Sequence, residues 1–259
     1  MTTEEEAMMQ HKGDNILIPP RGDDLKKMGG DCMYTPFGPC VGYTQLSKKI
    51  VKKLNKTCDD HSKGKKLLTP HAPHLVGKVT EEPAIPRHLV REIMDEVYQT
   101  MCNFMWLSKS REVKQSVALH PNNQMEFTPS SAWFVRQYEN EYNPIHVHTG
   151  CHLSCIGYLK IPDSIEKDRQ NDPKNGRSAT HGLTEFVYGH ASDVIPAATN
   201  FRIIPEVGDF YLFPATLQHQ VYPFQTKGER RSFSINIGFE LKEIQSPSNF
   251  VPLRDKANF

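Results

Sequence analysis

Short strand-like segments dominate the chain from about residue 130 onward. Residues of high β propensity, many of them alternating in polarity, occupy 133–138, 153–160, 183–188, 200–204, 209–213, 218–224 and 230–241, with turn-forming residues between them. Short strands at this spacing are typical of antiparallel sheets that close into a sandwich or barrel. The pattern predicts a mainly β fold of the α+β class, in which residues 130–241 form a double-stranded β-helix, also called a jelly roll or cupin-like fold.

Two amphipathic segments precede these strands. Apolar residues recur at helical spacing within 44–55, and a longer apolar stripe runs through 86–107, where Pro86 suits the first turn of a helix. The lysines of 48–56 fit the solvated face of the first helix. We therefore predict helical support over residues 43–110 that braces the outside of the barrel.

Two histidines stand two residues apart, and a third follows on a later strand-like segment. On an extended strand, positions two apart project from the same face, so His146 and His148 can reach one metal ion, and His219 would complete the set. Imidazole suits iron, zinc, copper and nickel, and three protein ligands leave coordination positions open for a cosubstrate and oxygen. Two alternatives remain open here: ordinary surface or core histidines, and a structural zinc site of His146, His148 and Cys151.

The last strand-like segment has one polar and one mainly apolar face. Arg230, Ser232, Ser234 and Asn236 occupy alternate positions, as expected for a barrel strand that lines a polar cavity on one side and packs on the other. The planar guanidinium of Arg230 suits a dicarboxylic acid, because it can form two parallel hydrogen bonds with one carboxylate. Ser232 would add a hydroxyl donor to the same carboxylate.

Taken as an ordered series, these motifs resemble the iron(II)- and 2-oxoglutarate-dependent oxygenases. The resemblance covers about residues 130–240, and is closest to the small bacterial and phage oxygenases of that superfamily with a His-x-His signature. In chain order the series consists of His146-x-His148, the strand 153–159, the approach 208–215 to His219, and Arg230-x-Ser232.

The resemblance implies an enzyme that uses Fe(II), 2-oxoglutarate and O2 to hydroxylate a substrate, with release of succinate and CO2. It implies that His146 and His219 bind the metal, and that Arg230 and Ser232 bind the far carboxylate of 2-oxoglutarate. Tyr158 stands where such enzymes often place a hydroxyl against that carboxylate. The metal and the cosubstrate carry out the chemistry, while the protein binds and orients the reactants and prevents side reactions.

One position departs from the family pattern. Most of the superfamily has Asp or Glu where this chain has His148, and three neutral imidazoles leave the full dipositive charge on the metal. We favour ligation by His148, because its spacing places it on the same face as His146. In the alternatives, water replaces His148, or a distant acid such as Glu141, Glu185 or Asp209 takes its place.

The rest of the chain divides by composition. Residues 1–42, rich in Gly, Pro and charge, predict an extended N-terminal arm, and residues 43–259 predict a single catalytic domain that ends in a C-terminal tail, 242–259. The polar segment 163–182 predicts a mobile flap near the substrate entrance or a disordered insertion. Trp133 and Tyr138 line the substrate pocket or belong to the core.

Composition also limits the kinds of partner that we expect the chain to bind. Lys and Arg number 31 against 30 for Asp and Glu, which gives no electrostatic case for a nucleic-acid partner, and the apolar runs are too short for a membrane span. The six cysteines lack Cys-x-x-Cys spacing, and the acidic N-terminus lacks a signal-like pattern, which favours free thiols in a cytoplasmic setting. The arm would suit a homodimer.

Two other function classes compete with the oxygenase. One is a cupin-like metal-binding protein, or a three-histidine dioxygenase or isomerase, that does not use 2-oxoglutarate. The other is a metal-free interaction domain. The substrate, whether a small molecule or a protein side chain, cannot be read from the sequence, because loops shape its pocket.

Overall fold

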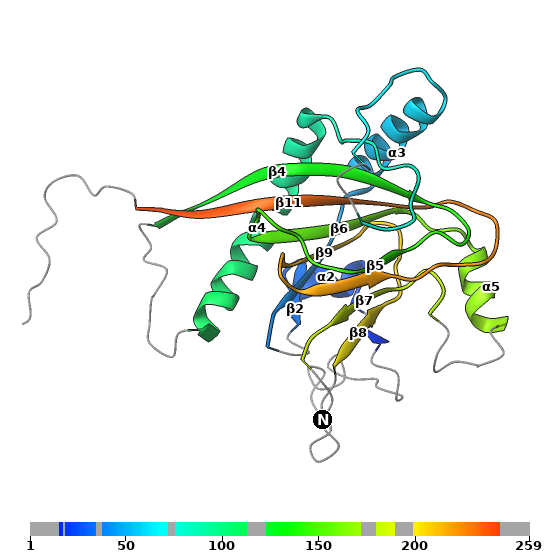
Figure 1. Ribbon diagram of the computed structural model, residues 1–259. Coiled ribbons are helices and arrows are strands. Elements are labelled where there is room, and N and C mark those ends of the chain that lie inside the picture. Colours follow the sequence, from blue (N-terminus) through cyan, green and yellow to red (C-terminus); the bar gives the residue numbers. More distant parts are fainter. Residues whose placement is uncertain are drawn as a thin grey trace, which may run out of the picture.

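The computed structural model describes residues 16–17, 19–34, 38–71, 76–112, 123–171, 180–189 and 199–243. Strands supply most of the ordered elements (Figure 1). The strands are β1 (Ile16–Leu17), β2 (Asp31–Tyr34), β3 (Val41–Gln45), β4 (Asn123–Gln137), β5 (Asn143–His146), β6 (Leu153–Lys160), β7 (Thr184–Val187), β8 (Asn200–Ile203), β9 (Asp209–Pro214), β10 (Gln218–Val221) and β11 (Arg230–Glu243). The helices are α2 (Asp23–Lys27), α3 (Lys48–Ser62), α4 (Arg87–Glu112) and α5 (Ser164–Asn171).

The strands form two sheets that face each other. The smaller sheet has the order β1-β8-β7-β10-β5 and the larger one β2-β3-β9-β6-β11-β4. A buried hydrogen bond of 2.7 Å between the hydroxyls of Tyr158 on β6 and Thr184 on β7 joins the two inner faces. Apolar side chains from both sheets, among them Tyr43, Phe186 and Phe213, fill the space between them. The predicted mainly β double-stranded β-helix is confirmed.

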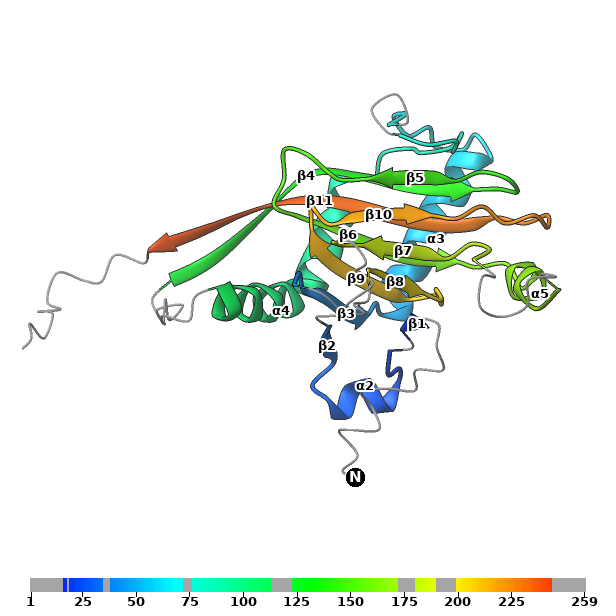
Figure 2. The same cartoon turned by 60° about the horizontal axis from the view of Figure 1, so that its bottom comes forward.

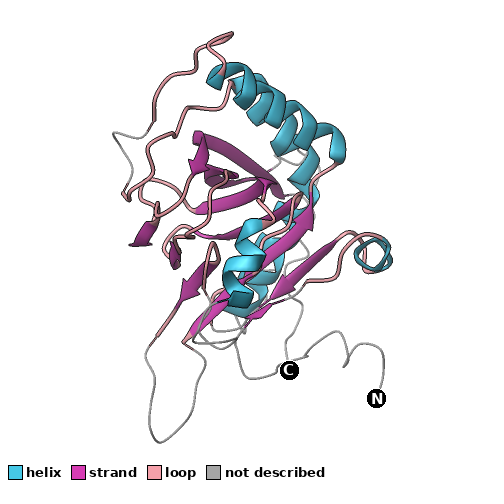
Figure 3. Cartoon of the chain, turned by 90° about the vertical axis from the view of Figure 1, so that its right-hand side faces the viewer, coloured by secondary structure: helices cyan, strands magenta, loops and turns pink. Residues whose placement is uncertain are grey.

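Helices α3 and α4 pack against the outer face of the larger sheet, so the predicted bracing is confirmed (Figure 3). Because side chains alternate along a strand, Phe233, Ile235 and Ile237 of β11 all point outward into the core beneath these helices. The Ser47 hydroxyl caps α3 by accepting a hydrogen bond from the backbone N–H of Ile50.

An ion-pair cluster on this outer face fixes the start of β11. The Glu229 carboxylate accepts hydrogen bonds from Arg231 at 2.8 and 2.9 Å and from Arg136 at 2.7 Å. Arg231 also reaches Asp59 of α3 at 2.7 Å. Arg231, Arg136 and Glu229 are largely buried, whereas Asp59 is about half exposed. Removing one of the three buried partners costs about 3–5 kcal/mol. The cluster therefore attaches α3 to the start of β11.

Several element bounds differ from the prediction. The β4–β11 pair runs over the full length of both strands, so β4 begins ten residues before 133, and its ribbon extends past α4 (Figure 2). The strand predicted over 218–224, which precedes β11, is β10 and ends at Val221. Pro223 cannot donate a hydrogen bond to a neighbouring strand, so the pairing stops before it. Helix α3 begins after its Ser47 cap and continues to Ser62.

Parts of the predicted arm, 1–42, are built into the sheets. Residues 1–15 lie outside the described residues, but β1 pairs with β8, and β2 pairs with β3 in the larger sheet. Arg21 donates to the buried carboxylate of Asp209 on β9 at 2.9 and 3.2 Å. The division between an arm and a catalytic domain at residue 42 stays a prediction.

The predicted flap, 163–182, contains the short helix α5, and residues 172–179 lie outside the described part. Asp168 of this helix accepts hydrogen bonds from the backbone N–H groups of Gln225 and Thr226, which anchors α5 to the β10–β11 connection. All six cysteines are free. None of the helices in the described ranges is long and apolar enough to cross a membrane.

Candidate metal centre

His146 and His219 are direct cross-strand partners on β5 and β10. Their ring centroids are 4.2 Å apart. His148 follows the end of β5, where its backbone N–H donates to the Ala215 carbonyl at 2.9 Å and turns its ring toward the same point. One ligand nitrogen from each of the three rings lies within 4.8 Å of the others. The structure thus brings together the three predicted metal ligands.

Backbone carbonyls orient two of the rings. The Nδ1 atom of His146 lies 2.7 Å from the Pro144 carbonyl, and Nδ1 of His219 lies 3.0 Å from the Leu217 carbonyl. A carbonyl accepts only, so each Nδ1 carries the proton and each Nε2 keeps a free lone pair. This second contact is typical of metal-binding histidines, because it fixes both the tautomer and the ring.

The protonation state suits a cation as well. Burial lowers the pKa of His146, and burial together with the neighbouring His146 lowers the pKa of His148 to about 4. His219, only 6% exposed, has its pKa lowered well below the usual value, mainly by burial. All three rings are therefore neutral at neutral pH, the form that binds metal.

No carboxylate joins this group among the described residues. The three acids considered as replacements for His148 are engaged elsewhere. Glu141 accepts hydrogen bonds from Thr80 and Tyr138, Glu185 from Asn200, Arg202, Gln220 and Tyr222, and Asp209 from Arg21, Tyr43 and the backbone of Glu206. Cys151, the ligand of the alternative zinc site, also lies outside the group.

His152 likewise lies outside the centre. Its Nδ1 accepts a hydrogen bond of 3.0 Å from the backbone N–H of Phe239. Trp133 is 3% exposed and forms part of the wall, because its ring stacks on His148 with centroids 5.9 Å apart and on His71 with centroids 4.9 Å apart. Tyr138 lies elsewhere, under the guanidinium of Arg136 at 5.5 Å.

Arg230 is a fully buried cation in the same interior. Its guanidinium donates to the Gly182 carbonyl at 3.1 Å, to Gln137 Oε1 at 3.2 Å and to Thr184 Oγ1 at 3.1 Å, and it lies 5.1 Å from the centre of the Tyr158 ring. All of these partners are neutral, and within the described ranges no carboxylate pairs with it. Burial accordingly lowers the pKa of Arg230. A buried charge without a counter-ion is costly, so this position favours an anionic ligand.

The polar face of β11 connects this cation with the histidines. Ser232 is the cross-strand partner of Tyr158, and its hydroxyl lies 3.5 Å from Arg230 Nη1. Four positions further on, the Asn236 side chain acts on the His148 ring and counteracts part of the lowering of its pKa. The predicted polar face therefore runs from the guanidinium to the metal centre along one strand.

Sequence reasoning missed two residues at the Arg230 end, Gln137 and Thr184. Gln137 carries a usable signal, since it is a polar residue in phase with Trp133 and Val135, which lie on the inner face of β4. Thr184 offers no comparable signal, because a threonine at the start of a strand is ordinary.

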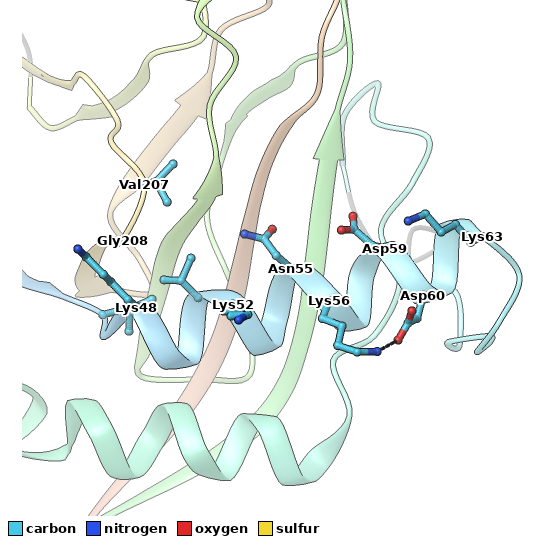
Figure 4. Close-up of a pocket in the computed structure, with 11 residues that line it drawn as sticks. Lys48, Lys52, Asn55, Lys56, Asp59, Asp60, Lys63, Val207 and Gly208 are labelled. Carbon is cyan, nitrogen blue, oxygen red and sulfur yellow. Dashed lines mark hydrogen bonds and ion pairs between the residues drawn. The ribbon is translucent and has the colours of Figure 1, made fainter.

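A pocket of about 610 Å³ lies elsewhere, along α3 and the turn at Val207 and Gly208. Figure 4 shows Lys48, Lys52 and Lys56 on this helix, with Lys56 paired to Asp60 four residues later. The exposed lysines confirm the predicted solvated face. None of the residues of the histidine centre lines this pocket.

Comparison with known proteins identifies one family model, described as "Putative 2OG-Fe(II) oxygenase", which matches residues 131–236. The matched range contains the three histidines, Tyr158, Arg230 and Ser232. No curated protein matches the chain.

Solved structures that match the chain include a prolyl-4-hydroxylase from Pseudomonas putida, with 14% identity, a TM-score of 0.44, and coverage of 83% of this chain and 95% of that one. Another is a 2OG-Fe(II) oxygenase family oxidoreductase from Burkholderia pseudomallei, with 10% identity, a TM-score of 0.46, and coverage of 88% and 95%. A third is a viral collagen prolyl hydroxylase from Paramecium Bursaria Chlorella virus-1, with 14% identity, a TM-score of 0.42, and coverage of 76% and 94%.

Proposed function

We propose that the chain is a 2OG-Fe(II) oxygenase in which His146, His148 and His219 hold the iron and Arg230 binds 2-oxoglutarate. The match of residues 131–236 to the family model supports the proposal. The observation that carries the proposal is the placement of three converging neutral imidazoles and an uncompensated buried guanidinium in one interior. When bound, Fe(II) with 2-oxoglutarate and O2 supplies the oxidising chemistry, in which 2-oxoglutarate becomes succinate and CO2.

Backbone carbonyls hold the rings of His146 and His219 so that each presents the lone pair of its Nε2 atom, and Nε2 of His148 lies 3.2 Å from Nε2 of His219. Such preorganised ligands need no reordering when metal enters. Because no carboxylate of the described residues joins the three histidines, the cation would keep its full charge, and the anionic cosubstrate would supply the compensation. We therefore expect metal and 2-oxoglutarate to strengthen each other's binding.

Arg230 orients the cosubstrate by gripping its far carboxylate. A guanidinium held by three neutral acceptors is fixed in place before the ligand arrives, so little side-chain freedom is lost on binding. Ser232 adds a hydroxyl beside Nη1, and the Tyr158 ring covers the face of the guanidinium. The low dielectric of this closed site strengthens each of these contacts.

The substrate is a small molecule or a protein side chain, and its hydroxylation is the outcome that we propose. The test is an anaerobic titration of the purified protein with Fe(II) and 2-oxoglutarate, followed by absorption and then by succinate release in air. We expect an absorption band that needs both components, and succinate in air. Metal binding that 2-oxoglutarate does not affect would instead support the cupin-like alternative.

A further inference from the structure

Tyr211, in the middle of β9, carries a hydroxyl with no partner. Its side chain is fully buried, and in the part of the chain that the structure describes, nothing hydrogen-bonds to its Oη atom. Its two tyrosine neighbours differ in this respect. Tyr43 donates to Asp209 at 2.9 Å, and the Tyr158 hydroxyl is paired with Thr184 at 2.7 Å.

An unpaired buried hydroxyl destabilises a fold, because it gives up hydrogen bonds to water and gains none in return. Such groups are rare in folded proteins, and each requires a physical reason. Burial raises the pKa of the Tyr211 hydroxyl well above its usual value. The group is therefore a neutral O–H donor at any physiological pH, and its natural partner is an acceptor that the protein alone does not supply.

The sheet register places Tyr211 between the two ends of the interior. Its cross-strand partner is Ile156 on β6, which in turn pairs with Ser234 on β11. The inner-face position on one side of this row belongs to Tyr158, whose ring centroid is 6.2 Å from that of Tyr211 and which covers the guanidinium of Arg230.

The inner-face position on the other side of the row is Phe213, on the same strand as Tyr211. The Phe213 ring lies 4.9 Å from the ring of His219, centroid to centroid. Successive inner-face positions along a strand are about 7 Å apart. A ligand that spans from the guanidinium to the histidines therefore crosses the row of Tyr211.

We propose that the Tyr211 hydroxyl donates a hydrogen bond to 2-oxoglutarate, as a positioning residue between Arg230 and the metal centre. This inference rests on the proposed function of the site. It gives the Tyr211 hydroxyl a partner. The other two hydroxyls among its cross-strand neighbours, those of Ser234 and Tyr43, already donate to acceptors within the protein.

The test compares Tyr211→Phe with the matched control Tyr43→Phe. Each change removes one buried hydroxyl from neighbouring rings 5.1 Å apart, but only Tyr43 uses its hydroxyl within the protein. Affinity for 2-oxoglutarate is measured by calorimetry on the Mn(II)-loaded protein without oxygen. The thermal midpoint is measured without ligands, and succinate release gives KM and kcat for 2-oxoglutarate.

For Tyr211→Phe we expect 2-oxoglutarate to bind about tenfold more weakly, as for loss of one hydrogen bond to a charged acceptor. KM should rise by a similar factor, and the ligand-free thermal midpoint should stay the same or rise. For Tyr43→Phe we expect the reverse pattern: a lower midpoint with unchanged affinity for 2-oxoglutarate.

Unchanged affinity in Tyr211→Phe, with an active wild-type protein, would overturn this inference and leave the proposed function standing. An equal loss of affinity in Tyr43→Phe would also overturn it, because the effect would then be general packing. A wild-type protein that does not bind 2-oxoglutarate at all would overturn the proposed function, and the role of Tyr211 with it.

Discussion

The Nε2 atoms of His148 and His219 lie 3.2 Å apart. Since Nδ1 of His219 carries its proton, Nε2 of that ring offers its lone pair toward His148. His148 thus lies beside His219, and under the proposed function it takes the ligand position where most of the superfamily that the chain resembles has an acid.

Removal of either ring should weaken metal binding. We expect His148→Ala and His219→Ala each to reduce affinity for Fe(II) or Mn(II) roughly 100-fold, about 3 kcal/mol per ligand. His152→Ala, a nearby histidine outside the centre, is the control and should leave affinity unchanged. Metal titration of the purified variants checks this. Full affinity in His148→Ala would mean that water, and not His148, completes the site.

Arg230 and Arg231 offer a matched pair, because adjacent residues of one strand point to opposite faces. Arg230→Lys keeps the charge but loses the planar fork, so we expect 2-oxoglutarate to bind about tenfold more weakly while metal affinity stays the same. Arg231→Lys disturbs the Glu229 cluster on the outer face, and should lower thermal stability without affecting 2-oxoglutarate. Calorimetry with 2-oxoglutarate and thermal unfolding separate the two effects. If Arg230→Lys and Arg231→Lys bound 2-oxoglutarate with the same affinity, Arg230 would not be part of the 2-oxoglutarate site.

Glu229 should make the fold sensitive to acid. Burial by itself raises the pKa of Glu229, but hydrogen bonds from Arg231 and Arg136 outweigh it and hold the pKa at about 2. The folded state therefore binds this proton less tightly than the unfolded chain does. The resulting stability, about 3 kcal/mol, is present above pH 4.5 and is lost as pH falls toward 2. Denaturant unfolding from pH 6 to pH 3 should show this slope in the wild type and a shallower one in Glu229→Gln.

Glu82 should act in the opposite direction. The residue is 5% exposed, and its burial, aided by the nearby Glu141, raises the pKa of its carboxyl to about 8. Ionisation of this buried group opposes folding, so stability is complete below pH 4.5 and falls as pH rises toward 8. Glu82→Gln should therefore be more stable than the wild type at pH 8 by about 3–5 kcal/mol, and similar to it near pH 5. The same stability difference at both pH values would contradict the prediction.

Local periodicity in the sequence is sufficient to predict much of the interior of the fold. Alternation along β11 indicated which residues line the cavity and which pack beneath the helices, because a strand has only two faces. The spacing of His146 and His148 indicated a shared direction, and the bounds of β6 agree at both ends with the predicted 153–160. In each case neighbours along the chain carry the signal.

Other features depend on contacts between distant segments. The segment around Glu81 and Ala84 lies along β4 and forms isolated bridges to Arg136 and Trp133. No periodic pattern in the local sequence predicts this pairing. Strand β9 is buried on both faces, so its sequence shows no alternation that would single out Tyr211. Among the residues that the structure describes, Arg230 has neutral partners only, and this too follows from tertiary packing, since carboxylates are abundant in the sequence.

The complete enclosure of Arg230 has a kinetic consequence. The guanidinium has no exposed surface, whereas His146 and His148 are partly open to solvent. Under the proposed function, the diacid at Arg230 therefore lies deeper in the fold than a molecule that approaches the histidines. We accordingly expect the diacid to bind first, and an excess of the molecule to be oxidised to slow turnover.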